Sequence, residues 1–157
     1  MDSLIKMTPE KLKETDTVMR AQVNCAAKLL ENLKEGEEPL CNIALYHLAV
    51  WAKYMLKIVC RRHSIIYTED DSVDDMFNKT SGHLPAVILD ISVDICYWHS
   101  SVQYEKANVK GKDEVYEAGR IIESFYNEHI LPYLKEIVNT AEKSTRYARE
   151  MKKLEIF

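Results

Sequence analysis

Apolar side chains recur at helical spacing through most of this 157-residue chain. In the first long segment Leu12, Met19, Ala26 and Leu33 repeat every seven residues. That spacing places them on one face of an α-helix. Glycine and proline number only four each, too few for the many tight turns of an all-β protein. The pattern therefore predicts an all-α fold.

Helix start and stop signals divide the chain into four long segments. Thr8 followed by Pro9 is typical of a helix N-terminus, and Gly36 of a stop. The predicted helices cover residues 9–35, 40–63, 85–109 and 113–133, with a single helical turn from Ser72 through Phe77 after a capping box.

Pro132 interrupts the fourth of these helices. It has no N–H to donate, and its ring crowds the carbonyl of Glu128. The helix therefore kinks there or gives way to a fifth, running to about Lys153. We expect one domain, residues 1–157, folded as an antiparallel bundle of four long helices, the last kinked or split at Pro132.

Charge and cysteine content bear on partners and location. The formal net charge is -4, and residues 64–110 carry eight acidic but only three basic side chains. A protein that wraps nucleic acid usually shows a basic excess. The four cysteines form no Cys-x-x-Cys motif, and the sequence shows neither a signal peptide nor a run of 18 apolar residues. These features predict a cytoplasmic protein with no membrane contact.

Three histidines are candidate metal ligands. On helical wheels His47 and His129 lie near the centres of their apolar faces, and His99 lies somewhat off the centre of its own. Helical bundles hold transition metals between facing helices in this way. However, the Glu-x-x-His and His-x-x-x-His spacings are missing. The alternative is that each histidine is a core or boundary residue with an ordinary hydrogen-bond partner and that the protein has no cofactor.

A second candidate site is the cationic cluster of Lys57, Arg61 and Arg62 near the end of the second helix. Such a cluster could receive a phosphate. Basic residues also stabilise the negative end of a helix dipole, which explains the cluster without any ligand.

Motifs for nucleophilic catalysis and phosphate loops are lacking. In contrast, Tyr46 and Tyr97 fall on the outward sides of their predicted helices, and exposed tyrosine favours interfaces. The sequence thus predicts a non-enzymatic interaction or scaffolding protein that forms a homodimer or higher homo-oligomer.

The stretch from Ile43 to Lys57, IALYHLAVWAKYMLK, resembles the second helix of HEPN-domain proteins, with its aromatic-His-x-Ala pattern. This resemblance implies a helical dimer associated with nucleotides or RNA, with a nucleotidyltransferase or RNA as partner. Ribonuclease members of that family carry an Arg four to six residues before a His. Here Arg120 precedes His129 by nine, so the resemblance implies a module without the ribonuclease motif.

Part of the same stretch, Leu45 to Trp51, also resembles the first metal-ligand helix of DinB-type bundles. Those bundles pair an early His with a late His-x-x-x-His. His129 matches one late position, and Tyr133 occupies the other. In the composition of its helices, which carry Ile, Lys, Tyr and Met, the chain also resembles small helical proteins of archaea.

Overall fold

The computed structural model describes residues 8–37, 39–101, 111–142 and 151–157. Every regular element in these ranges is helical, which confirms the predicted all-α bundle. The α-helices are α1 (Pro9–Glu31), α2 (Leu40–Arg62), α3 (Val73–Thr80), α4 (Ala86–Leu89), α5 (Ser92–Ser101), α6 (Lys112–Phe125) and α7 (Leu131–Glu142). A 3-10 turn, Ser81–His83, follows α3, and a π-helical turn, Tyr126–Ile130, joins α6 to α7.

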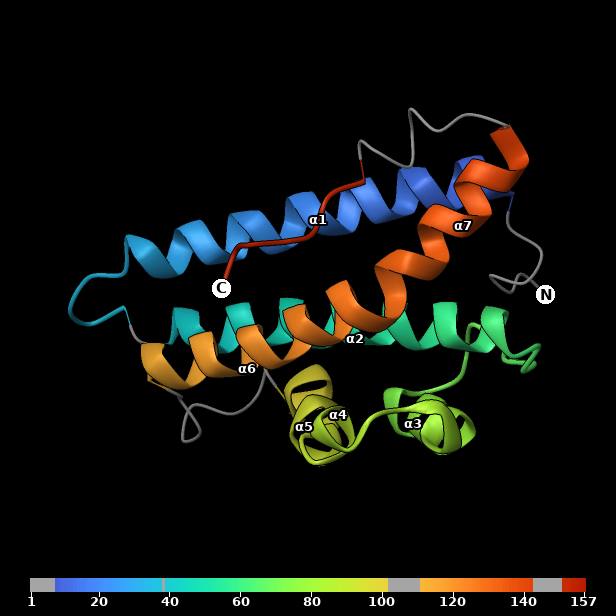
Figure 1. The fold of residues 1–157 in the computed structure, drawn as a ribbon. Helices are drawn as coiled ribbons and strands as arrows, with labels where there is room; N and C mark the ends of the chain where they lie inside the picture. Colours follow the sequence, from blue (N-terminus) through green and yellow to red (C-terminus); the bar gives the residue numbers. More distant parts are fainter. Residues whose placement is uncertain (1–7, 38, 102–110, 143–150) are drawn as a thin grey trace.

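The α1–α2 hairpin follows the local signals in the sequence. The Thr8 hydroxyl accepts a hydrogen bond from the backbone N–H of Lys11 at 3.2 Å, so Thr8 is the N-cap of α1. After α1, Gly36 adopts a φ of +86°, which glycine tolerates without strain. The chain then reverses, and α2 packs against α1 in the opposite direction (Figure 1).

The centre of the bundle is α2. Thirteen of its 23 residues are buried, and it contacts α1, α3, α5 and α6. Within the described ranges it is also the one helix long and apolar enough to cross a membrane, but two thirds of that apolar window is buried in the bundle. A core helix passes the same length and composition test because burial and lipid both favour apolar side chains.

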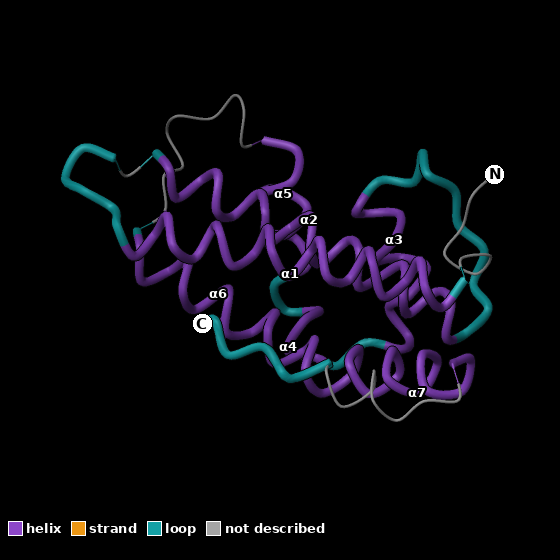
Figure 2. Tube along the Cα trace, turned by 90° about the horizontal axis from the view of Figure 1, so that it is seen from above, coloured by secondary structure: helices purple, strands orange, loops and turns teal. Residues whose placement is uncertain are grey.

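The middle of the chain differs in detail from the expected long helix over residues 85–109. The helix breaks after Leu89, and α5 begins at Ser92 and is described to Ser101; residues 102–110 lie outside the described part. Ile88 and Ile95 are both buried on either side of the break. Because both short helices bury the same side, the apolar spacing alone predicts one helix. Figure 1 shows α4 and α5 nearly end-on, so they cross α2, whereas Figure 2 shows them lengthwise.

The predicted capping box is present. The Asp75 backbone N–H donates to the Ser72 hydroxyl, and the Ser72 N–H donates to the Asp75 carboxylate, both at 3.0 Å. The helix that it starts, α3, extends beyond the expected single turn and ends at Thr80.

The predicted kink near Pro132 is confirmed, and it takes the form of the π-helical turn. Leu131 donates its N–H to the Tyr126 carbonyl, five residues back. A wider turn accommodates the missing donor and the bulk of the proline ring. Beyond this turn α7 packs against α1, while α6 runs in the same direction as α2 (Figure 1).

The expectation of a helix to about Lys153 is wrong for residues 151–153. α7 is described to Glu142, residues 143–150 lie outside the described part, and Met151–Phe157 is extended. This segment, here called the tail, lies beside α1 and α6 in both views (Figures 1 and 2). Side chains of α1, α6 and the π-helical turn bind its backbone groups, which reduces the need for helical hydrogen bonds.

Candidate functional site

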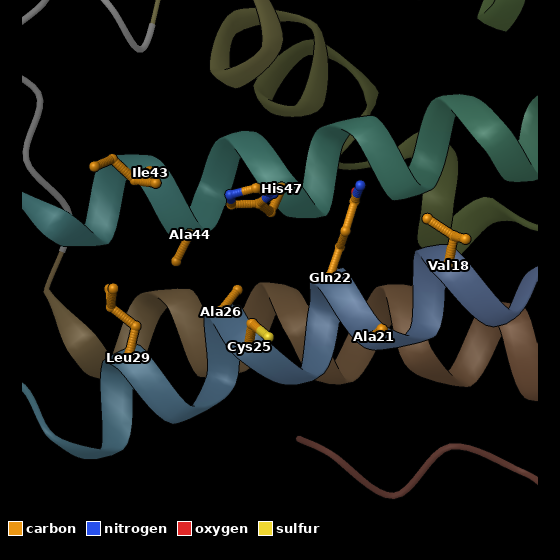
Figure 3. A pocket seen from close by; sticks show the side chains of 9 residues that line it. All are labelled: Val18, Ala21, Gln22, Cys25, Ala26, Leu29, Ile43, Ala44 and His47. Atoms are coloured by element: carbon orange, nitrogen blue, oxygen red, sulfur yellow. The ribbon is translucent and has the colours of Figure 1, made fainter.

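An apolar groove runs between α1 and α2 on their outer face (Figure 3). Its cavity volume is about 390 Å³. The residues that line the groove are Val18, Ala21, Gln22, Cys25, Ala26 and Leu29 from α1, and Ile43, Ala44 and His47 from α2. None of these nine side chains is a carboxylate, a lysine or an arginine. We call this set the α1–α2 groove.

Side-chain size explains the shape of the α1–α2 groove. Its floor is built from the small, buried residues Ala26 and Ala44, which leave a hollow between the helices. Larger apolar side chains project around it: Val18 is 55% exposed, and Ile43 is 46% exposed. Exposed apolar side chains gathered around a hollow indicate a contact surface more than scattered ones do.

Polar groups in the α1–α2 groove are few. Figure 3 shows the Gln22 side chain extending from α1 toward α2, where His47 lies. Cys25 is an exposed free thiol. A carboxamide, an imidazole and a thiol can orient a partner through hydrogen bonds, but the lining holds no carboxylate to orient the imidazole as a general base.

The three candidate metal ligands lie on different elements: His47 on α2, His99 on α5 and His129 on the π-helical turn. The first two are half-buried and flank the Tyr46 ring, at centroid distances of 6.0 Å and 5.5 Å. Burial, and secondarily the charge of Lys53, lowers the pKa of His99.

His129 is exposed and contacts the Phe125 ring at 5.6 Å, so its predicted place at the centre of an apolar face is wrong. The π-helical turn adds a residue to the turn and rotates His129 away from the core. Among the described residues, no three His, Cys, Asp or Glu side chains are grouped closely enough to hold a metal ion. A metal held by His47, His99 and His129 stays a prediction.

The cationic cluster is divided among different neighbours. Lys57 forms an ion pair with Glu69 at 3.0 Å, and the Arg62 guanidinium lies 5.5 Å from the centroid of the Tyr133 ring on α7. Arg61, on the same helix, is half-buried. A phosphate at this end of α2 would therefore compete with existing contacts, and the phosphate-binding role of Lys57, Arg61 and Arg62 stays a prediction.

The sequence reasoning missed a buried polar cluster made of Asp16, Arg20 and Tyr126. The Tyr126 hydroxyl donates to Asp16 Oδ1 at 2.6 Å, and Arg20 Nε donates to Asp16 Oδ2 at 2.9 Å. Arg20 Nη2 also donates to the Tyr126 hydroxyl at 2.8 Å. Two features of the sequence could have predicted this cluster. Asp16 and Arg20 are four residues apart, and Asp16 lies on the helix face that also holds Leu12 and Met19.

Burial sets the electrostatics of this cluster. Asp16 is 2% exposed. Its burial raises the pKa of the carboxyl, and the hydrogen bond from Tyr126 and the charge of Arg20 only partly oppose that rise. The pKa of the Tyr126 hydroxyl is also raised, first by burial and then by the Asp16 charge. The tyrosine therefore acts as a donor, and the cluster ties α1 to the π-helical turn.

Comparison with protein-family models, curated proteins and solved structures finds no match to this chain. The resemblances to HEPN and DinB bundles stay predictions from the residues quoted for them.

Proposed function

We propose that the protein is a non-enzymatic interaction protein that self-associates through the α1–α2 groove. The observation that carries the proposal is the groove itself, an exposed apolar hollow without charged lining residues. A twofold contact brings the same patch of two copies together. A patch with charges of one sign would repel its own copy there, whereas an uncharged patch can pair with it.

The shape of the groove supports the same pairing. Val18 and Ile43 project beside a floor of small residues. Two copies related by a twofold axis can each place these side chains into the other's hollow. Both helices have 23 residues, and 1.5 Å per residue makes each roughly 35 Å long. That length offers room for a standard interface of about 800 Å² per partner.

Light scattering and sedimentation across micromolar to millimolar protein concentration test this proposal. We expect the wild type to form a dimer and Val18→Glu to shift its dissociation constant upward by at least a hundredfold, because a buried charge would meet its own copy. Val93→Glu is the matched control, since Val93 is 79% exposed on α5, away from the groove.

Two results would contradict the proposal. If the wild type stays monomeric from micromolar to millimolar concentration, the protein does not self-associate. A dimer that dissociates with Val93→Glu but not with Val18→Glu moves the interface to α5.

The contacts at this end of α2 do not favour the HEPN-like alternative, because Lys57 and Arg62 already have partners. If that alternative holds, charge reversal at Arg61 and Arg62 weakens RNA binding and reduces its salt dependence. A cytoplasmic location belongs to both proposals and rests on the sequence.

A further inference from the structure

The tail, Met151–Phe157, is seated like a bound peptide. It runs between α1 and α6, antiparallel to α6 (Figures 1 and 2). Along the tail the contacts are first with Asn127 on the π-helical turn, then with Glu123 and finally with Gly119 on α6. These three residues are spaced four positions apart, so they lie on one face of the helix. We call Arg20, Gly119, Glu123 and Asn127 the tail site.

Asn127 clamps one residue of the tail. Its Nδ2 donates to the Leu154 carbonyl, and its Oδ1 accepts from the Leu154 N–H, both at 2.8 Å. A carboxamide carries a donor and an acceptor side by side, so it matches the N–H and C=O of one extended residue. This pairing substitutes for a neighbouring β-strand.

Glu123 and Arg20 complete the backbone contacts. Glu123 Oε2 accepts from the N–H groups of Ile156 and Phe157, at 2.7 Å and 3.1 Å. Arg20 Nη1 donates to the Lys152 carbonyl at 2.7 Å. Bonds to charged groups are stronger than neutral ones, and all of these contacts recognise an extended backbone.

The site distinguishes side chains at the positions where the tail carries apolar residues. Met151 and Leu154 are buried, whereas Lys152, Lys153 and Glu155 are exposed. The ring of Phe157 lies directly over Gly119, where an added Cβ would come within 2.5 Å of it. Gly119 is therefore the floor of a slot for an aromatic ring, and Tyr116 forms an edge contact with that ring at 6.0 Å.

We propose that the tail site is a peptide-recognition site for extended segments supplied by another protein, and that the tail is its resident competitor. The preferred ligand has apolar residues at the positions of Met151 and Leu154 and an aromatic ring at the position of Phe157. Every contact described above is made to backbone groups or apolar side chains, so none requires the ligand to belong to the same chain. The site is separate from the α1–α2 groove, and the proposal does not depend on self-association.

The probe is a synthetic peptide with the sequence of Met151–Phe157, blocked at both ends and labelled with a fluorophore. It is titrated against the full chain and against a full-length variant with a weakened tail, Leu154→Ser/Phe157→Ser. A tethered competitor acts at about millimolar effective concentration. We therefore expect the tail-weakened variant to bind the probe at least tenfold more tightly than the wild type does.

Two further substitutions in the tail-weakened variant locate the binding. Asn127→Ala should weaken probe binding at least tenfold, whereas Ser124→Ala, at an exposed position of α6, should leave it unchanged. Gly119→Ala should weaken binding of the probe, but not of a peptide with alanine in place of Phe157, because the added methyl group fills the ring slot.

A measurement on the wild-type chain tests the proposal even if the variants do not fold. Excess unlabelled peptide should accelerate amide hydrogen exchange at Leu154, Ile156 and Phe157 of the wild type, because it displaces the tail. Unchanged exchange at millimolar peptide, or probe binding that is insensitive to Asn127→Ala, would overturn the proposal.

Discussion

The two faces of α1 reverse the usual distribution of polar and apolar groups. The face turned toward the π-helical turn buries Asp16 and half-buries Arg20, whereas the face of the α1–α2 groove leaves Val18 and Leu29 exposed. Buried polar groups are tolerated when every group has a partner, and in this cluster Tyr126 supplies one. Among the residues that the structure describes, none provides comparable cover for the apolar face. The inner face therefore contributes to stability, and the outer face is the one that we propose for self-association.

Asp16→Ala tests the inner face and should have the largest effect. It leaves the charge of Arg20 without its carboxylate partner in a largely buried place. We expect the free energy of unfolding to fall by about 3 kcal/mol, as for other broken buried pairs. Urea unfolding measures the change. Glu14→Ala is the control, because Glu14 is exposed and its ion pair with Lys11 is long, at 3.8 Å; a similar loss in both variants would contradict this assignment.

Tyr126→Phe removes only the hydroxyl that joins Asp16 to Arg20. The ring keeps its contact with Trp51, whose ring centroid lies 5.5 Å away. The loss of stability therefore measures the contribution of the hydrogen bonds. We expect a decrease of about 1.5 kcal/mol in the free energy of unfolding, because the buried Asp16 and the half-buried Arg20 each lose a hydrogen bond. In combination with Asp16→Ala, the second substitution should cost much less, and strict additivity would show that the three residues do not act together.

The raised pKa of Asp16 predicts a pH dependence. The folded chain binds a proton at Asp16 more readily than the unfolded chain does, whose carboxyl titrates near 3.8. This carboxyl therefore contributes stability at acidic pH that is lost as the pH rises through the folded pKa. Relative to Asp16→Asn, the wild type should become less stable as the pH rises above the unfolded value of 3.8. Urea unfolding at several pH values checks the sign, and the opposite trend would mean that Arg20 dominates over burial.

Val18→Glu tests the outer face and should have the smallest effect on the monomer. At a protein concentration below the association range, we expect the free energy of unfolding to change by no more than about 0.5 kcal/mol, because Val18 is already exposed. At high concentration the wild type should gain stability by mass action, and the variant should not. Thermal unfolding at several protein concentrations makes this comparison. A wild-type unfolding temperature that does not change with concentration would contradict the contrast between the two faces.

Features set by neighbouring residues could be predicted from the sequence. The Thr8 cap, the capping box at Ser72 and the boundaries of α2 all follow from local hydrogen bonding and apolar spacing. The interruption near Pro132 was predictable because proline lacks an N–H. Its form as a π-helical turn was not, and that form decided the exposure of His129.

Features that depend on distant contacts could not be predicted. The tail reads as helical from its alternating charges, but Glu123 and Asn127 hold it in an extended form across more than 25 residues of sequence. The partners of Lys57 and Arg62 likewise come from other elements.

The sequence alone determined that this chain folds into amphipathic helices, because helix formation depends on residues three and four positions apart. It also marked Leu12, Met19 and Ala26 as one apolar face of α1, and all three are buried. Only the tertiary structure decided that no described part of the chain covers the second apolar face, around Val18 and Cys25. Which faces are covered depends on where the other helices and the tail pack, and that is settled by contacts between residues far apart in the chain.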